Sequence, residues 1–387
     1  MKQTIDKIDV QGKRVLMRVD FNVPMRDGII TDDRRIQLSL PSIKSVVDRG
    51  GSLTLLSHLG RPSGRGFESE YSLVPVATRL SELLGVPVSC SEDDQTSQII
   101  LRENLRFHTT EKSGDSSFAK SLIAGADIYC NDAFGTAHRN HASMVAVPEA
   151  MEGKPRVAGL LLSKELQYLD HAIANAEHPF VAVLGGAKVS DKMSAIADLL
   201  GKVDAILIGG AMAYTFLVSQ GKKVGSSLVE SDRVEDAKEM LLLASESTTD
   251  VLLPSDHVCG QNIKEGTSTQ IIEPPIPEGW MGLDIGSETV ATYSDILRNA
   301  KTIVWNGPMG VFEMNPFDRG TKQIALAIAE ATEQGAVSIV GGGDTAAAVS
   351  LFGVDAQMTH ISTGGGASLQ MLEGKAFSSV TLLDDAV

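Results

Sequence analysis

The sequence predicts an α/β protein built from two doubly wound, parallel-sheet (Rossmann-like) lobes that are joined by a hinge helix. Its 387 residues are too many for one ordinary hydrophobic core, because domains usually hold ~100–200 residues. In both halves of the chain, short apolar segments alternate with segments of helical periodicity. That alternation is typical of parallel strands covered by helices on both faces.

The predicted strands are short apolar segments, rich in β-branched residues, that each end in a small polar or glycine-rich cluster. They are Val15–Val19, Leu53–Leu56 and Ile128–Cys130 in the first half, and Phe180–Leu184, Ala205–Ile208, Thr302–Trp305 and Val337–Val340 in the second. Ligands of such sheets bind beyond the carboxyl ends of the strands. The clusters therefore indicate where the chemistry is expected.

A long helix over Ser163–His178 is predicted to join the lobes. Leu166 and Leu169 keep helical spacing, and Pro179 ends the pattern. The chain then divides into a first lobe of residues 1–170 and a second lobe of residues 171–374.

Composition excludes several classes of protein. A net charge of −15 argues against a nucleic-acid binder. The longest uncharged run, Ala205–Gly221, is shorter than the ~20 residues of a membrane span, and we expect a strand, a turn and a helix start there. The polar N-terminus is unlike a signal peptide, so a cytoplasmic protein is expected. Cys90, Cys130 and Cys259 lie too far apart for a disulfide framework or a metal motif.

Arginine is concentrated in the first lobe. The first 150 residues carry a net charge of −1 and the remainder −14. This could be a chance imbalance of surface charge, or it could indicate an anion site, since arginine suits forked binding of phosphate and carboxylate. Polar residues at or just after the strand ends favour a small polyanion that also carries hydroxyls, although His58 alone could equally be a core histidine. These residues are Asp20, Asn22, Arg35, His58, Arg61, Arg106 and Arg139.

Glycine clusters in the second lobe predict a mononucleotide site, because glycine lets the backbone approach a phosphate at a helix start. A P-loop is absent. The segment Gly341–Ala346 formally fits the dinucleotide pattern, but Asp344 at the helix start would repel a bare pyrophosphate. That conflict disappears if Asp344 binds Mg²⁺. The alternative is plain N-capping by Asp344 and Thr345.

Lys188 and Lys192 are spaced so that a helix would place both on one face, where an anion could lie between them. Asp191 is the alternative partner of these two lysines. Glu313 could accept a hydrogen bond from a ribose hydroxyl, although a lone glutamate is more often a surface residue.

Eight segments together resemble phosphoglycerate kinases. They are Arg18–Pro24, Ser57–Pro62, Glu103–Phe107, Asn131–Arg139, Gly185–Lys192, Trp305–Glu313, Gly341–Thr345 and Ser362–Ser368. They span nearly the whole chain in the family's order. The stretch Cys90–Ile100 is shorter than its family counterpart, and Leu101-Arg102 stands where two leucines are common; both departures concern a surface connection.

The resemblance implies transfer of a phosphoryl group between 1,3-bisphosphoglycerate and Mg²⁺-ADP, giving 3-phosphoglycerate and ATP. It implies a monomer, and a C-terminal tail, 375–387, that packs back on the first lobe. Because water could otherwise accept the phosphoryl group, we also expect hinge bending that closes the lobes when both ligands are bound, with hinges at the helix Ser163–His178 and at Ser362–Gly366. It assigns phosphoglycerate to Asp20, Phe21, Asn22, Arg35, His58, Leu59, Gly60, Arg61, Arg106 and Arg139. It assigns nucleotide to Gly186, Ala187, Lys192, Gly210, Asn306, Pro308, Glu313, Gly342, Gly343, Asp344 and Thr345, with Asp344 facing the metal. Arg35, Lys188 and Gly343 would be catalytic.

Two other functions fit parts of the pattern. A two-lobe nicotinamide-dependent oxidoreductase needs an acidic residue about 20 positions beyond its glycine-rich turn. Asp355 comes too early for that role, and Glu373 lies beyond another strand and glycine cluster. A non-catalytic small-anion binding protein would explain the arginines but not two phosphate sites of different character.

Overall fold

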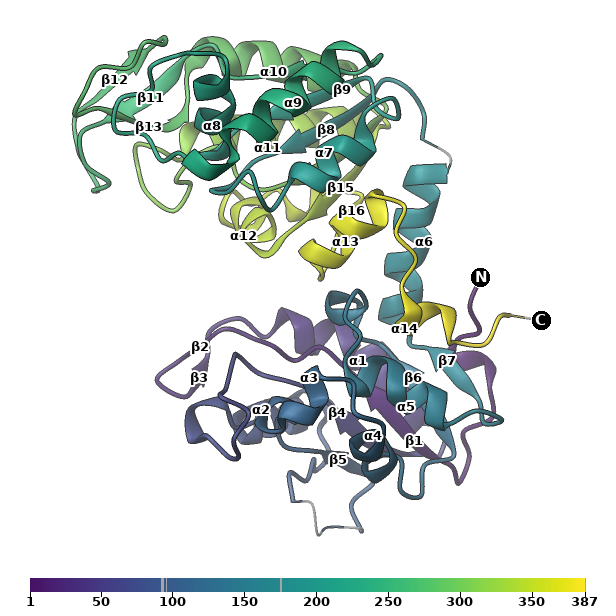
Figure 1. The fold of residues 1–387 in the computed structure, drawn as a ribbon. Coiled ribbons are helices and arrows are strands. Elements are labelled where there is room, and N and C mark those ends of the chain that lie inside the picture. Colours follow the sequence, from purple (N-terminus) through teal and green to yellow (C-terminus); the bar gives the residue numbers. More distant parts are fainter. Residues whose placement is uncertain (92–93, 95, 175, 387) are drawn as a thin grey trace. The chain divides into compact units, whose positions relative to one another are not determined.

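The chain forms two compact units in a computed structural model that describes residues 1–91, 94, 96–174 and 176–386. Unit 1 consists of Met1–Gln167 and Ala376–Val387, and unit 2 of Tyr168–Lys375 (Figure 1). The division falls within helix α6 (Leu160–Ala174). None of the helices in the described part of the chain has the length and apolar character that crossing a bilayer requires.

Unit 1 is built on a five-stranded sheet in the order β5-β4-β1-β6-β7, in which every neighbouring pair is parallel. Its strands are β1 (Arg14–Arg18), β4 (Ser52–Leu56), β5 (Ile99–Leu101), β6 (Ile128–Asn131) and β7 (Arg156–Ala158). Helices α1 (Arg34–Val47) and α2 (Val74–Leu84) bury one face of the sheet in a shared core. Leu16 and Tyr129, on the opposite face, are also buried. Burial on both faces explains the continuously apolar strand sequences.

Besides short 3-10 and π-helical turns, the remaining strands and α-helices of unit 1 are short. They are the hairpin β2 (Met25–Arg26) and β3 (Ile29–Ile30), and helices α3 (Thr109–Lys112), α4 (Ser116–Leu122), α5 (Val147–Ala150) and α14 (Ser378–Thr381). Helix α14 belongs to the C-terminal segment and is fixed to unit 1 by the Ser379 hydroxyl, which donates to the Ala137 carbonyl at 2.6 Å. The Asp384 carboxylate accepts from the Arg156 amide at 2.8 Å.

Unit 2 contains a six-stranded parallel sheet in the order β10-β9-β8-β14-β15-β16. Its strands are β8 (Phe180–Leu184), β9 (Ala205–Ile208), β10 (Asp250–Leu252), β14 (Thr302–Asn306), β15 (Val337–Gly341) and β16 (His360–Ile361). Its helices are α7 (Met193–Leu199), α8 (Met212–Ser219), α9 (Val234–Ser245), α10 (Ser287–Asn299), α11 (Arg319–Glu333), α12 (Gly343–Leu351) and α13 (Gly365–Leu372). Helices α10 and α11 share a core with this sheet.

The predicted fold class is confirmed, and each of the seven predicted strands agrees with the structure to within one residue at either end. The short edge strands β5, β7, β10 and β16 were not predicted. Also unpredicted is a small antiparallel sheet of unit 2, with β11 (His257–Gly260) between β12 (Thr269–Ile272) and β13 (Met281–Ile285). Edge strands of two or three residues leave too little sequence for a pattern to emerge.

Helix α6 starts at Leu160, three residues before the predicted start at Ser163. The buried Asp132 carboxylate explains this difference, because it accepts hydrogen bonds from the Leu161 and Leu162 amides at 2.9 and 3.2 Å. The helix ends at Ala174 rather than at His178. Asn175, within the predicted helix, lies outside the described residues, as do residues 92, 93 and 95 of the short segment Cys90–Ile100.

Candidate functional site

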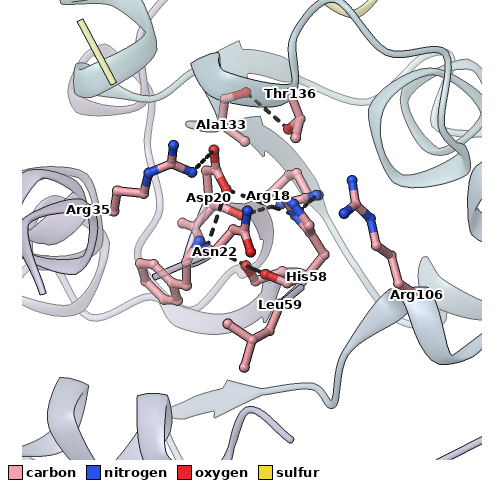
Figure 2. A network of polar contacts seen from close by, with 12 residues as sticks. Arg18, Asp20, Asn22, Arg35, His58, Leu59, Arg106, Ala133 and Thr136 are labelled. Carbon is pink, nitrogen blue, oxygen red and sulfur yellow. Dashed lines mark hydrogen bonds and ion pairs between the residues drawn. The ribbon is translucent and has the colours of Figure 1, made fainter. Parts of the chain in front are cut away.

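The polar residues of unit 1 gather at the carboxyl edge of its sheet (Figure 2). Asp20 follows β1, and its Oδ2 accepts from Arg35 Nη1 at 2.8 Å. Arg35 lies in the first turn of α1, so this contact joins a strand end to a helix start. His58 follows the neighbouring strand β4 and is almost fully buried.

Two hydrogen bonds connect the loop after β4 to the segment after β1. Asn22 Oδ1 accepts from the Gly60 amide at 2.8 Å, and Ser57 Oγ accepts from the Phe21 amide at 2.9 Å. Gly60 has φ +59°, and a Cβ there would lie 2.4 Å from the Tyr71 ring. The side chains of Phe21 and Leu59 belong to the hydrophobic core, so only their backbone lies at the strand ends.

Three arginines complete this edge. Arg106 follows β5, and its Nη1 donates to the Gly60 carbonyl at 2.8 Å. Its buried Nε has no hydrogen-bond partner among the described residues. Arg61 and Arg139 follow β4 and β6, respectively, and both are exposed to solvent. The structure thus places all of the predicted phosphoglycerate residues of unit 1 on loops or helix starts at one edge of the sheet.

Burial and neighbouring cations both lower the pKa values of titratable groups in this cluster. Burial, followed by the charge of Arg18, lowers the pKa of Arg106. Burial, together with the neighbouring Arg106 and Arg18, lowers the pKa of His141 to about 4. Burial and Arg139 lower the pKa of His138 to about 4 as well, and its buried Nδ1 has no partner in the described chain. A bound anion would relieve this repulsion.

Sequence reasoning did not single out Arg18 as a site residue. It is the last residue of β1, is fully buried, and lies beside His58. The available signal was a charged residue within the predicted strand Val15–Val19, whose other residues are apolar. Glu111 and Ser143, which contact the same network, gave no such signal because they come from distant segments.

In unit 2, three glycine-rich loops interlock beyond β8, β9 and β14. The Gly186 amide donates to the Pro308 carbonyl at 3.0 Å, and the Gly210 amide donates to the Met309 carbonyl at 2.9 Å. Gly210 has φ +67°, and a Cβ on it would lie 2.4 Å from the Gly186 carbonyl oxygen. Glycine is required here because the loop backbones pack directly against each other.

These loops form one wall of a cavity of about 480 Å³. Six of the predicted nucleotide residues line it, namely Gly186, Ala187, Gly210, Pro308, Glu313 and Asp344. Much of the remaining lining is apolar and was not predicted; it includes Tyr214, Leu228, Ile263, Met281 and Val311. Part of it comes from the unpredicted antiparallel sheet. A mostly apolar cavity with a few polar groups suits a purine base and ribose.

Other predicted nucleotide residues lie at the adjoining strand ends. Lys192 Nζ donates to Asn306 Oδ1, and burial lowers the pKa of Lys192. Thr345 is buried, and its hydroxyl accepts from the Gly307 amide at 2.7 Å, so it connects α12 to the loop after β14. Gly342 has φ +97° and immediately precedes α12, where Gly343 is the first residue.

The prediction that Lys188 and Lys192 share a helix face is wrong. Helix α7 begins only at Met193, and the preceding residues form a loop and a turn in which the Lys192 amide donates to the Val189 carbonyl. Val189 is buried, and Ser190 is bound to the Glu230 carboxylate at 2.7 Å, which keeps this segment out of the helix. Lys188 is exposed, whereas Lys192 is half-buried.

Asp344 is exposed in the first turn of α12 and lines the cavity. The described residues contain no cluster of three or more His, Cys, Asp or Glu side chains that could hold a metal ion. A single carboxylate still fits Mg²⁺, because this ion is commonly bound by one or two carboxylates together with substrate phosphates and water.

Comparison with known proteins agrees with this geometry. The sequence model of the phosphoglycerate kinase family matches residues 5–375. A phosphoglycerate kinase of Rhodopirellula baltica is 57% identical over 100% of both chains, and one of Thermosipho africanus is 52% identical over 98% of this chain and 97% of its own. The structure of phosphoglycerate kinase from Coxiella burnetii superposes with a TM-score of 0.87 at 39% identity, covering 99% of this chain and 98% of that one. The chain therefore belongs to the phosphoglycerate kinase family.

Proposed function

We propose that unit 1 binds 3-phosphoglycerate and that unit 2 binds the nucleotide with Mg²⁺. The reaction is reversible phosphoryl transfer from 1,3-bisphosphoglycerate to ADP, which gives 3-phosphoglycerate and ATP in glycolysis and gluconeogenesis. The chain is thus a phosphotransferase with a carboxyl group as acceptor.

The phosphoglycerate assignment is supported by the arginine cluster at the carboxyl edge of the unit 1 sheet, and this observation carries the proposal. Arg61, Arg106 and Arg139 supply fork-shaped donors suited to a phosphate. Asp20 and Asn22 supply acceptors suited to a hydroxyl. Arg106 Nε is buried without a protein partner in the described chain, so protein contacts do not fully satisfy this guanidinium.

The nucleotide assignment is supported by the cavity of unit 2. Its apolar wall suits a purine, and Glu313 suits a ribose hydroxyl. Gly342 and Gly343 leave the start of α12 free of side chains, and amides at a helix start attract phosphate. Lys192 lies beside the same strand ends.

Mg²⁺ belongs to this proposal through Asp344. The Asp344 carboxylate would hold the ion at the start of α12, where nucleotide phosphates supply the other oxygens. When bound, Mg²⁺ neutralises phosphate charge. Without it, a carboxylate at this position would repel the phosphates.

No general base is needed for the transfer. In ATP synthesis the nucleophile is a β-phosphate oxygen of ADP that is already ionised, and in reverse it is a carboxylate. The contribution of the protein is therefore positioning and charge. We assign Arg35 of unit 1 and Lys188 of unit 2 as cations for the transferring phosphoryl group, and the Gly343 amide as a further donor.

Calorimetric titration of the full chain tests the assignments. Arg106→Ala is expected to weaken 3-phosphoglycerate binding at least ~10-fold, because a charge-assisted hydrogen bond is lost. ADP binding should be unchanged. Asp344→Asn is expected to reduce the Mg²⁺ dependence of ADP binding and to leave 3-phosphoglycerate unaffected. Arg79→Ala, which removes an arginine paired with Asp33 and Glu82, is the control. If the effects of the two site variants were exchanged, the assignment of ligands to units would be wrong.

A coupled assay with 3-phosphoglycerate, ATP and Mg²⁺ completes the test. Omitting each component in turn is expected to abolish turnover. If turnover persisted after Mg²⁺ had been removed by chelation, the proposal that Asp344 acts by binding Mg²⁺ would be wrong.

A further inference from the structure

We propose that Arg18 is a positioning residue that fixes His58 as its Nε2–H tautomer, so that His58 acts as a neutral hydrogen-bond donor in unit 1. The inference deepens the proposed function, and rests on it, because it concerns how His58 would meet phosphoglycerate. It gives Arg18 a role through His58 rather than through the substrate.

The contact between the two side chains determines the tautomer. Arg18 Nη2 lies 3.0 Å from His58 Nδ1, in the centre of the network in Figure 2. A guanidinium has donors only and stays protonated. His58 Nδ1 must therefore be the unprotonated acceptor, and the ring proton lies on Nε2.

The other ring nitrogen is available for a ligand. His58 Nε2 has no hydrogen-bond partner in the described part of the chain. This nitrogen is also not fully buried, so a ligand can reach it. The nearest carboxylate oxygen to Nδ1 is Asp20 Oδ1 at 3.9 Å, which is too far for a hydrogen bond. An Nε2–H group suits an anionic or hydroxyl oxygen of the substrate.

Arg18 itself is held in place from several sides. Its Nε donates to Ser143 Oγ at 2.9 Å, and Nη1 donates to the Val19 carbonyl. Ser143 Oγ donates to Glu111 Oε1 at 2.6 Å, and the Ser143 amide donates to Glu111 Oε2 at 3.0 Å. Arg18 and Glu111 are both fully buried. The carboxylate therefore compensates the buried guanidinium through the serine, and the guanidinium cannot easily rotate away from His58.

The surrounding charges also keep His58 neutral. The groups that face it are Arg18 on β1, Asp20 beyond that strand, Arg35 on α1, Arg106 after β5 and His141 before the helical turn at Ala142–Ala146. Burial first, and then the cations led by Arg18, lower the pKa of His58 well below its usual value. His58 should not gain a proton between pH 6 and 8, so its contribution to phosphoglycerate binding should be constant over that range.

The tautomer can be observed directly in the free protein. Multiple-bond ¹H–¹⁵N correlation spectra of the full chain labelled with ¹⁵N-histidine distinguish the two neutral tautomers from imidazolium, and His58→Ala identifies the His58 signals. We expect the Nε2–H tautomer throughout pH 6–8. An Nδ1–H tautomer or an imidazolium in this range would overturn the inference whatever the substrate is.

Variants test whether Arg18 is the cause. In Arg18→Met we expect a mixture of the two neutral tautomers and a His58 titration that moves upward by at least about one pH unit. We also expect KM for 3-phosphoglycerate to rise about 10-fold, with a smaller change in kcat. Arg18→Lys keeps a cationic donor and should largely restore the tautomer. Ser143→Ala keeps the charge of Arg18 but removes one anchor, and should give a smaller effect in the same direction. If Arg18→Met fails to fold, Ser143→Ala provides the test of positioning by Arg18.

Arg49→Met is the matched control, because Arg49 donates to the backbone carbonyls of Ile5, Ile8 and Ser45 in the same unit. It should affect stability but neither the His58 spectrum nor KM. An unchanged tautomer and titration in Arg18→Met would overturn the positioning role. If Arg18→Met changed the tautomer but not KM for 3-phosphoglycerate, the KM of His58→Ala would show which part of the inference is wrong. An altered KM in His58→Ala would refute positioning by Arg18, and an unchanged KM would instead refute the assignment of His58 to the phosphoglycerate site.

Discussion

Arg35 Nη1 donates to Asp20 Oδ2 across 2.8 Å and thereby connects the first turn of α1 to the end of β1. Asp20→Asn keeps the size and one acceptor but loses the charge-assisted bond. We expect KM for 3-phosphoglycerate to rise about 3- to 10-fold, because Arg35 is held less firmly and a hydroxyl acceptor is weakened. Steady-state kinetics at saturating Mg²⁺-ATP measures this. The control is Asp32→Asn, next to the same helix start, which should not change KM for 3-phosphoglycerate. An unchanged KM in Asp20→Asn would show that Asp20 is not part of the site.

Lys188 is exposed on the loop between β8 and α7. Lys188→Ala is expected to lower kcat at least ~100-fold while leaving nucleotide KM nearly unchanged, the pattern of a group that acts mainly in the transition state. Lys202→Ala, an exposed lysine beyond α7, is the control. A kcat equal to that of the unmodified chain would exclude Lys188 from the mechanism.

Arg61 and Arg65 are exposed arginines on the same loop after β4, which makes them a matched pair. Arg61→Ala should raise KM for 3-phosphoglycerate, because it removes a fork-shaped donor for the phosphate. Arg65→Ala removes the same charge from the loop and should change KM much less. The kinetic comparison uses identical Mg²⁺-ATP concentrations. Equal KM changes in both variants would indicate a general charge effect instead of a site residue.

The C-terminal segment stabilises unit 1 through Ser379, whose hydroxyl is buried and donates to the Ala137 carbonyl. Ser379→Ala leaves that carbonyl without this donor, and we expect unit 1 to lose about 1–3 kcal/mol in its free energy of unfolding. Hydrogen exchange of the β1 and β6 amides reports on this unit itself. The neighbouring Ser378 is exposed, and Ser378→Ala should change little. Equal protection in both variants would contradict the role given to Ser379.

Asp132 makes the stability of unit 1 depend on pH. Burial raises its pKa to about 7 in the folded state, whereas an unfolded aspartate titrates near pH ~4. Between these values the folded state binds more protons, so this group reduces stability as pH rises, by up to about 1.4 kcal/mol per pH unit. Above the folded pKa the effect is constant.

Asp132→Asn keeps an oxygen for the Leu161 and Leu162 amides and removes the titration. We expect the loss of unit 1 stability between about pH 4 and pH 7 to be reduced in this variant, as measured by hydrogen exchange or denaturant unfolding. Asp48→Asn changes an exposed aspartate of the same unit and should retain the slope. An identical slope in Asp132→Asn would show that Asp132 is not the titrating group.

Strand ends are predictable because an apolar run and the cluster after it are adjacent in the sequence. That adjacency alone indicates that Asp20, His58, Gly186 and Gly210 follow the carboxyl ends of strands. The local conformation of a segment cannot be predicted from its own residues where contacts with distant segments determine it. The spacing of Lys188 from Lys192 predicts a helix, whereas burial of Val189 and the contact of Ser190 with Glu230 keep that segment in a loop.

The fold class, the seven principal strands and the family are predictable from the amino-acid sequence, since each depends on local periodicity or on motifs of adjacent residues. The contacts that support the site arise from folding. Arg18 contacts His58 and is itself bound to Ser143, which is bound to Glu111. Part of the apolar lining of the unit 2 cavity comes from the antiparallel sheet. These groups are far apart along the chain and become neighbours only when the sheets form. The hydrogen-bonding state of a buried side chain is therefore set by contacts that no local pattern records.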